Sequence, residues 1–465
     1  MPIEREQQRV SCSLSNLTGG MNVSVPENMI ADNEAVLIEN YMFEQGVLRT
    51  RDGYSLPLIS INDPIEKIWY DLSTEGFLIF TTPASENDTS DVYYGYIANS
   101  ETTLQPEKIG KLAGRERPVC HKFGSKIIIA SGGKLQYYDY QNPLVTIESS
   151  FLSDNLWVQD SRLGTSKRGD DKFHYSSTGD CTSEEAWKED TNMISQAQWY
   201  RIGAFDGGDI ITVLPLAGDL IVFKTNDRGY RISGTVPELS SDAILSNTHA
   251  EDDRESFALM GGTIVFATDV GMRSLQTTTT YGNFDTVEVA YKINRLLQEQ
   301  CYKPKVWNML TRRQLWIRPN EAQKDIFYIY QWDTGAAYKY VFHDGINDVV
   351  ETSNGIILAT DYGLHRMSSE YSKDGEYYFT SRITSKMFIT PNKITTRYFD
   401  IFVESRLGYD TGDILVQVAD RSFLYSLGSK RRIKHFYASL RALAIELSST
   451  SPHIIKNFNL YGIDE

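Results

Sequence analysis

Short apolar runs bounded by turn residues recur along the chain and predict buried β-strands. The clearest run is Leu220–Phe223, which follows Gly218-Asp219, precedes Asn226-Asp227 and is succeeded by the returning segment Tyr230–Ile232. A strand with one face in solvent alternates apolar and polar residues, so an unbroken run indicates a strand that is covered on both faces. The stretch therefore predicts a hairpin whose first strand is fully buried.

Similar hairpins repeat at a regular spacing. Their leading glycines are 48, 94, 44 and 93 residues apart, in the order Gly76, Gly124, Gly218, Gly262 and Gly355. Each long gap holds a strand-like stretch near its midpoint, Lys172–Ser176 in one and Gln314–Arg318 in the other. Periods of about 40–50 residues with several strands per unit are typical of β-propellers. We expect a propeller of six or seven blades over residues 61–370; a β-sandwich, or several small β domains, is the alternative.

The two ends of the chain depart from this repeat. Residues 1–60 predict an N-terminal extended segment with a short capped helix over 32–41 and a strand within 46–54. After the turn Asp374-Gly375, strands are predicted over 376–389, 395–404, 413–419, 434–447 and 456–462. These strands indicate a C-terminal β-sandwich-like domain over 376–465, so the predicted fold class is all-β.

Two stretches inside the repeat are less regular. Residues 149–200 are polar and predict a long loop that projects from one blade. In residues 287–300, Val289, Ile293, Leu296 and Leu297 fall at helical spacing, which predicts one short amphipathic helix between blades. We expect this helix to pack against its own domain rather than to dock a partner.

The charge balance narrows the partners. The chain has 61 acidic and 46 basic residues and a formal net charge of −15. Such a surface argues against tight binding of nucleic acid, although nucleic acid could still slide past it. The four cysteines are scattered without a CxxC pair, so neither a disulfide framework nor a zinc site is expected. A signal peptide and a membrane span are not expected either, because the start is charged and no apolar run approaches about 18 residues.

Motifs for catalysis are weak. The sequence contains no nucleophile elbow, Walker-type loop, HExxH or EF-hand loop. His121 beside Cys120 is interpreted as part of the core rather than as a metal site. The acidic run 251–255 could supply the paired carboxylates of a glycosidase, but we expect a solvated loop. The sequence thus predicts no catalytic residue, metal or cofactor.

One basic run is a candidate contact surface. It comprises Lys430, Arg431, Arg432 and Lys434, and aromatic residues follow it. Such a run could bind a phosphate backbone, protect a strand edge by its charge, or contact an acidic neighbouring subunit. We favour the protected edge over the phosphate site, and we take the four residues as the candidate subunit interface.

A series of short motifs resembles a known protein family. The N-terminal series is Gly19-Gly20-Met21-Asn22, Pro26, Ala31–Ala35, Asn40, Gly46–Leu48 and Arg51-Asp52-Gly53-Tyr54. Later motifs are Phe173–Ser176, Trp187, Asp206–Thr212, Leu220–Lys224, Ser381-Arg382-Ile383, Pro391, Lys393 and Tyr398–Glu404. In this order they resemble the tail nozzle, or packaged-DNA stabilisation, proteins (tail tubular protein B-like) of short-tailed bacteriophages. The resemblance is patchy and spans residues 14 to about 405.

The resemblance implies a structural role in the virion tail after assembly in the host cytoplasm. It implies a homo-oligomeric six-fold ring that docks on a portal or adaptor ring, carries distal tail or fibre proteins and passes double-stranded DNA without reading its sequence. Six copies at −15 give the ring a formal charge of −90. Because a basic wall would trap the genome, we expect a lumen richer in Asp and Glu than in Lys and Arg. A carbohydrate-binding or carbohydrate-active propeller is the alternative function.

Overall fold

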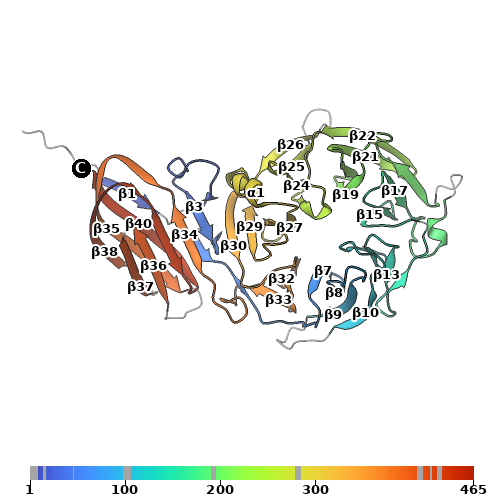
Figure 1. The fold of residues 1–465 in the computed structure, drawn as a ribbon, viewed down its shortest axis with the longest axis horizontal. Helices are drawn as coiled ribbons and strands as arrows, with labels where there is room; N and C mark the ends of the chain where they lie inside the picture. Colours follow the sequence, from blue (N-terminus) through green and yellow to red (C-terminus); the bar gives the residue numbers. More distant parts are fainter. Residues whose placement is uncertain are drawn as a thin grey trace, which may run out of the picture.

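The computed structural model describes residues 9–13, 17–44, 47–97, 106–149, 151–189, 195–277, 284–361, 363–405, 412–418, 421–426 and 432–464. A ring of blades occupies one side of the molecule, and a smaller β domain lies beside it (Figure 1). Strands make up most of the described chain, which confirms the all-β fold class. None of the helices in these residues has the length and apolar character that a bilayer crossing needs.

The ring is a β-propeller whose blades each contain four antiparallel strands. Across the described residues there are seven blades, and in each the first strand lies nearest the axis. Blade 1 contains β7 (Ile65–Asp71), β8 (Gly76–Thr81), β9 (Asp91–Tyr96) and β10 (Glu107–Lys111). Blade 2 contains β11 (Val119–Phe123), β12 (Lys126–Ala130), β13 (Gln136–Tyr138) and β14 (Val145–Thr146). Blade 3 contains β15 (Asn155–Gln159), β16 (Arg162–Ser166), β17 (Lys172–Tyr175) and β18 (Gln198–Arg201). Blade 4 contains β19 (Ile210–Leu216), β20 (Asp219–Lys224), β21 (Arg228–Thr235) and β22 (Glu238–Ser246). Blade 5 contains β23 (Phe257–Met260), β24 (Thr263–Thr268), β25 (Gly271–Thr277) and β26 (Phe284–Val289). Blade 6 contains β27 (Lys305–Met309), β28 (Gln314–Arg318), β29 (Ile326–Gln331) and β30 (Ala336–Val341).

Blade 7 closes the ring with strands from two distant parts of the chain. Its first three strands are β31 (Asp348–Thr352), β32 (Gly355–Thr360) and β33 (Gly363–Ser368). The fourth is β6 (Gly53–Tyr54) from the N-terminal segment, which pairs antiparallel with β33. The ring is therefore held shut by hydrogen bonds between chain segments that are some 310 residues apart, Tyr54 lying opposite Met367.

The apolar runs that set the sequence repeat form the second strand of most blades, where both faces are covered by neighbouring blades. Blade 3 differs, because its second strand is β16 and the stretch near residue 172 is the third strand, β17. The strand β16 carries no aliphatic run, and its Gly164 makes room for Trp157: a Cβ at Gly164 would lie 2.1 Å from the indole. The strand expected near residue 172 is therefore present, as the third strand of its blade rather than the second.

The prediction of a long loop over residues 149–200 is wrong in part. Most of that stretch forms blade 3, whose core includes Trp157, Phe173 and Tyr175. Polar residues line its turns, which gave the stretch the composition of a loop. A long connection does join β17 to β18; it contains the 3-10 turn η1 (Glu185–Trp187), in which Trp187 is buried.

The N-terminal segment links the propeller to the second domain. Its residues 34–39 form the strand β3 (Glu34–Glu39) and not the expected helix. This strand lies between β30 of blade 6 and β34 (Ser381–Ser385), and it also pairs with β2 (Gly20–Met21). Backbone pairing on both sides, with Ala35 and Ile38 fully buried, outweighs a weak helical preference.

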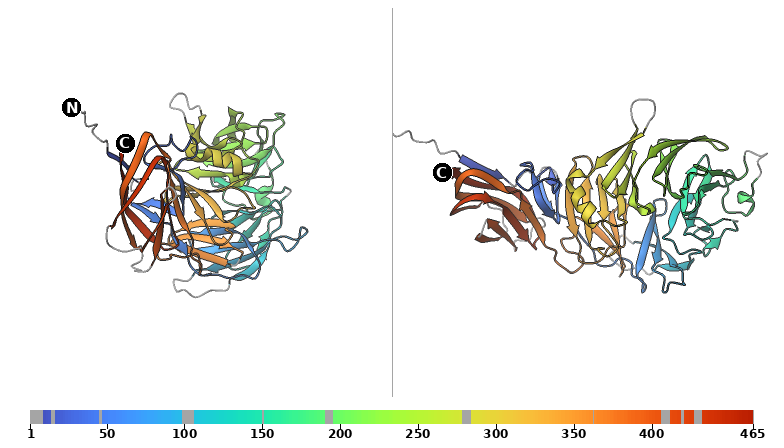
Figure 2. Two further views of the ribbon diagram at one scale, coloured as in Figure 1. Left: turned by 60° about the vertical axis from the view of Figure 1, so that its left-hand side comes forward. Right: turned by 45° about the horizontal axis from the view of Figure 1, so that its top comes forward.

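The sheet of blade 6 thereby continues into the C-terminal domain. Beyond β34 it adds β39 (Ile445–Ser449), β36 (Asp413–Val418) and β37 (Arg421–Ser426), giving a ten-stranded sheet. A second, six-stranded sheet contains β38 (Arg432–Leu443), β35 (Phe388–Ser405), β40 (His453–Asp464), β5 (Val47–Thr50), β4 (Tyr41–Glu44) and β1 (Arg9–Ser13). The two sheets face each other in the turned views (Figure 2).

One hydrophobic core crosses the boundary between the domains. It includes Trp316 and Tyr340 of blade 6, Leu447 of the extended sheet and Phe458 of the six-stranded sheet. The sandwich-like architecture agrees with the expected one, but the strand limits differ. The stretch 376–389 is divided between β34 and β35, the stretch 434–447 is divided between β38 and β39, and β37 was not expected.

The helix expected over residues 287–300 is shorter than its spacing indicated. Val289 ends the strand β26, and the helical part contains the 3-10 turn η3 (Tyr291–Ile293) and α1 (Asn294–Gln300). Ile293 and Leu297 are buried in the domain core, and α1 packs against β25 of its own blade. The helix thus packs as expected, over about half of the expected length.

Candidate functional site: the axial cavity

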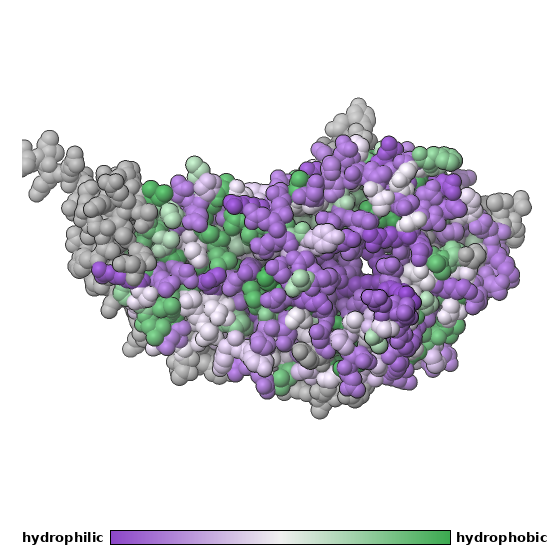
Figure 3. Space-filling model, in the orientation of Figure 1, coloured by the Kyte–Doolittle hydropathy of each residue, from purple (hydrophilic) through white to green (hydrophobic). Residues whose placement is uncertain are grey.

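The first strands of the seven blades surround a cavity on the propeller axis. The cavity has a volume of about 290 Å³, and every blade contributes at least one lining residue. Charged residues at the starts of these strands, and in the loops that precede them, form its mouth. In the space-filling view the ring is hollowed at its centre, and hydrophilic residues surround the opening (Figure 3).

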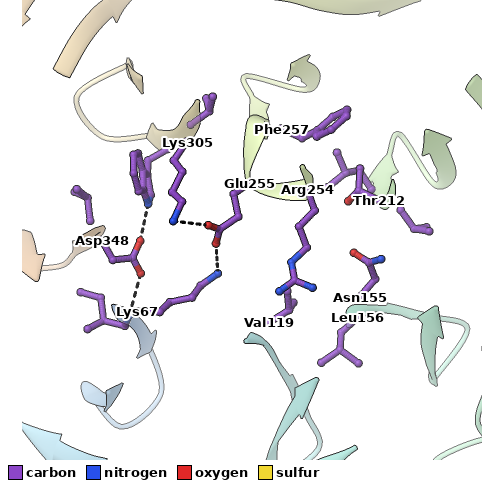
Figure 4. Close-up of a pocket in the computed structure, with 16 residues that line it drawn as sticks. Lys67, Val119, Asn155, Leu156, Thr212, Arg254, Glu255, Phe257, Lys305 and Asp348 are labelled. Carbon is purple, nitrogen blue, oxygen red and sulfur yellow. Dashed lines mark hydrogen bonds and ion pairs between the residues drawn. The ribbon is translucent and has the colours of Figure 1, made fainter. Parts of the chain in front are cut away.

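Glu255 is the centre of the charged groups at the mouth. Its side chain is only 15% exposed, and it accepts ion pairs from Lys67 at 2.8 Å, from Lys305 at 3.2 Å and from Arg117. Lys67 lies in blade 1 and Arg117 precedes blade 2, whereas Glu255 precedes blade 5, so these two ion pairs cross the axis. Figure 4 shows the pairs of Glu255 with Lys67 and Lys305. Burial opposes ionisation of Glu255, but the three cations outweigh it and hold the pKa of this carboxyl well below its usual range.

Asp348 of blade 7 is the second enclosed carboxylate. It accepts hydrogen bonds from the Trp307 indole at 2.7 Å and from the Ile68 backbone N–H at 2.9 Å, and Arg117 lies 3.3 Å away. Arg117 also donates to the carbonyls of Glu66 and Asn347. One guanidinium therefore connects blades 1, 2, 5 and 7 at the mouth of the cavity.

The expectation of a solvated acidic loop is wrong for Glu255 and holds only for some of its neighbours. Asp252 is exposed and pairs with Arg168 at 2.8 Å. Asp253 caps the 3-10 turn η2 (Arg254–Ser256), its carboxylate accepting the Glu255 N–H at 3.0 Å. That turn lies directly before β23 (Phe257–Met260), and Glu255 within it lines the cavity.

Glu66 adds a third carboxyl group beside Glu255. Burial raises the pKa of Glu66, although Arg117 and Lys305 oppose the rise. The mouth thus holds one carboxyl whose pKa is raised and one whose pKa is lowered. Groups with pKa values pushed apart in this way can act as an acid and a base, and the same pattern arises in purely structural ion-pair networks.

Other residues singled out in the sequence lie elsewhere. Lys430 and Arg431 fall outside the described residues; Arg432 and Lys434 lie on β38, which pairs with β35 in the six-stranded sheet. Cys120 and His121 lie on β11, where burial raises the pKa of the Cys120 thiol to about 12. His121 Nδ1 contacts the Lys122 carbonyl at 2.9 Å. Among the residues that the structure describes, no cluster has the composition of a metal site.

Sequence reasoning missed the residues that converge on the axis. Lys67, Arg117, Lys305 and Asp348 come from four blades and share no local motif. Their one common signal is position, because each lies at the start of a first strand or just before it. That signal becomes readable only when the seven first strands are known.

Several residues of the family resemblance lie at structural joints. Arg51 is fully enclosed, forms a two-pronged ion pair with Asp374 at 2.8 and 2.7 Å, and donates to Asn40 at 2.8 Å. In blade 4, Asp206 accepts hydrogen bonds from the buried Lys224 ammonium and from the Tyr230 hydroxyl, each at 2.7 Å. These residues hold loops to blades and the N-terminal segment to the propeller.

No protein-family model matches the chain, and no curated protein matches it. Solved structures with a similar fold include the extracellular domain of a hybrid two-component system from B. thetaiotaomicron, with a TM-score of 0.46, 10% identity, and coverage of 90% of this chain and 61% of that one. They also include BamB from Moraxella catarrhalis (TM-score 0.38, 9% identity, coverage of 77% and 98%) and an exo-beta-1,3-galactanase from Phanerochaete chrysosporium (TM-score 0.25, 10% identity, coverage of 89% and 100%). The chain spans about six tenths of the first of these structures, and the likenesses concern the fold alone.

Proposed function

We propose that the chain is a structural subunit of a ring-shaped tail nozzle in a short-tailed bacteriophage. The ring would extend the portal channel, retain packaged DNA and pass it during infection. The observation that carries the proposal is that one sheet and one core run through both domains. Residues of the family resemblance, Arg51 and Asn40 among them, lie at this joint.

A continuous sheet suits a part that bears mechanical load. Domains joined by small polar interfaces move relative to one another by default, and a large apolar interface suppresses that motion. Here blade 6 and the C-terminal domain share backbone hydrogen bonds through β3, from β30 on one side to β34 on the other. A ring of such stiff subunits can transmit force between a portal or adaptor ring and distal tail or fibre proteins.

The axial ion pairs bear on where DNA would run. The Lys67–Glu255 pair joins blades 1 and 5 across the axis of the propeller. A duplex therefore cannot thread a single propeller, and the DNA path in a six-fold ring would lie between subunits. We keep the expectation that this path is lined by more Asp and Glu than Lys and Arg.

The localisation in the virion gives the direct test. Electron micrographs of particles labelled with an antibody against this chain should show the label at the tail, below the portal. Particles made without the chain should lose their DNA after packaging. Label absent from the tail, with DNA retained in particles that lack the chain, would contradict the proposal. Finding a monomer in solution would not distinguish between the two functions, because the subunits of the nozzle proteins that this chain resembles often assemble only on the virion.

The basic run provides a test of the ring contact. Replacing Lys430, Arg431 and Arg432 with glutamine should raise the dissociation constant for ring assembly by roughly tenfold, since each exposed charge contact contributes about 0.2–1 kcal/mol. Native mass spectrometry of assembling tails measures this change, and DNA release from finished particles should stay the same.

A matched control replaces three exposed cations elsewhere. Lys188, Arg295 and Arg313 have side chains that are 56%, 70% and 61% exposed, and their replacement should leave assembly unchanged. Particles of the basic-run variant that assemble normally but leak DNA would show that these residues contact the duplex instead. An assembled-tail structure with the three side chains on a positive lumen wall would lead to the same correction.

One observation favours the alternative, a carbohydrate-active or carbohydrate-binding propeller. Glu66 and Glu255 lie at the mouth of one cavity with their pKa values shifted in opposite directions. Glycosidases use one protonated and one ionised carboxyl in this way. Release of reducing sugar from purified glycans by the wild-type chain, and its loss in the Glu66→Gln variant, would support this function over the structural one.

A further inference from the structure

We propose that the axial cavity of the propeller binds a compact organic carboxylate, with Arg254 as the residue that holds its charge. This inference is independent of the ring role, because it concerns a cavity enclosed within one subunit.

In the lining of the cavity itself, cationic side chains outnumber carboxylates by three (Lys67, Arg254 and Lys305) to two (Glu255 and Asp348). These three cations come from blades 1, 5 and 6 or the loops before them, and Arg117, which precedes blade 2, lies at the mouth. Glu255 forms direct ion pairs with Lys67, Arg117 and Lys305, and Asp348 is held by Arg117, Trp307 and the Ile68 N–H. On a chain with a formal charge of −15, a cavity with this surplus of positive charge is a local exception that favours an anion.

Arg254 is the cationic residue of the cavity lining that forms no ion pair with the carboxylates of that lining. Its guanidinium donates to the backbone carbonyl of Asp154, and no carboxylate in the described part of the chain is close enough to pair with it. The carboxylate of Asp154 accepts the backbone N–H of Arg168 at 2.9 and 3.0 Å and forms no ion pair with Arg254, although the charge of Arg254 opposes the rise that burial causes in the pKa of Asp154. Figure 4 shows the Arg254 guanidinium in the middle of the opening, between Glu255 and Asn155, so its remaining N–H groups face the cavity.

The rest of the cavity wall suits a small ring-shaped ligand. The apolar part of the wall includes Leu156, Val213, Phe257 and Val306. Thr212 lies on the same wall and makes no side-chain hydrogen bond within the described residues, so its hydroxyl can bind a ligand. The volume of about 290 Å³ is at the lower end of the range for ligand cavities, which favours a ligand of monosaccharide size.

The available charge favours a carboxylate over a phosphate. Among the described residues, Arg254 is the one cation of the cavity lining that forms no ion pair, whereas Glu255 and Asp348 belong to the lining and Glu66 and Asp154 to the mouth. A second negative charge on the ligand would face these carboxyl groups without a cation of its own. A single carboxylate can instead accept two parallel N–H donors from Arg254, the geometry in which guanidinium binds this group best.

The test measures ligand binding to the purified chain by titration calorimetry, with glucuronate, glucose and inorganic phosphate as probes. We expect glucuronate to bind at least tenfold more tightly than glucose and phosphate, and Arg254→Gln to weaken its binding about tenfold or more, as expected when a charged hydrogen bond is lost. The control Arg295→Gln, on the exposed face of α1, should bind glucuronate as the wild type does.

A second variant tests the cavity without altering charge. Val119→Phe places a ring in the cavity and should abolish glucuronate binding, which tests the site even if Arg254→Gln does not fold. Thermal unfolding of each variant shows whether it is folded. The proposal is overturned if the wild type does not bind glucuronate at millimolar concentration. Equal binding by wild type and a folded Arg254→Gln, or tighter binding of phosphate, would overturn it as well.

Discussion

Replacing Arg51 with alanine should lower the free energy of unfolding by about 3–5 kcal/mol, the usual cost of breaking a buried ion pair by removing one partner. Arg51 and Asp374 have no exposed side-chain surface, and the two form two hydrogen bonds at 2.8 and 2.7 Å. Removal of the guanidinium leaves the Asp374 carboxylate enclosed without its cation. Urea denaturation followed by tryptophan fluorescence measures the change.

The effect should be large because Arg51 joins three separate parts of the chain. It donates to Asn40 in the N-terminal segment and to the Val341 carbonyl at the end of blade 6, while Asp374 belongs to the linker before the C-terminal domain. Its guanidinium also lies 3.8 Å from the centre of the Phe379 ring. We therefore expect the variant to lose cooperativity, with the C-terminal domain and the propeller unfolding in separate transitions.

Two further variants give the comparison. Arg51→Lys keeps the charge but loses the two-pronged geometry, so it should retain part of the stability. Arg295→Ala removes an exposed arginine from a surface pair with Glu299 and should cost less than about 0.5 kcal/mol. If Arg51→Ala unfolds in one transition at nearly the wild-type urea concentration, the joint is not where the two domains are coupled.

The repeat was readable from the sequence because the second strand of most blades is covered on both faces. In β20 and β32 this requirement produces unbroken apolar runs that turn residues separate at regular intervals. Blade 3 lacks this pattern. Its second strand, β16, has no aliphatic run, and the Trp157 side chain of β15 fills the space over Gly164. A propeller of six or seven blades could therefore be predicted in outline, although the strand that marked blade 3 is its third and not its second.

The links between the domains could not be predicted, because they depend on partners distant in sequence. The strand β3 has no local signal that distinguishes it from a short helix, and its identity comes from β30 and β34, some 300 and 340 residues away. The cavity was hidden for a similar reason, since its charged residues meet only when the ring closes. Glu255 in particular was read with its acidic neighbours, although η2 turns it away from them.

Replacing Glu255 with glutamine should lower the free energy of unfolding at neutral pH by about 3–5 kcal/mol, because three enclosed cations then lose their common anion. Lys67, Arg117 and Lys305 would repel one another across the axis without it. Glutamine keeps the shape of the side chain, so the loss would reflect charge rather than packing. Glu299→Gln, in an exposed pair on α1, provides the control and should change stability by less than about 0.5 kcal/mol.

The difference between wild type and Glu255→Gln should also depend on pH in one direction. The pKa of Glu255 is held well below its usual range in the folded chain, so the unfolded chain binds the proton more readily. The stability that Glu255 contributes is therefore fully present above the unfolded pKa of about 4.3 and is lost as the pH falls toward the folded value. Unfolding measured from pH 7 down to pH 3 should show the two curves converging on acidification. A gap that stays constant, or that widens as the pH falls, would mean that the carboxylate is not stabilised by the cations around the axis.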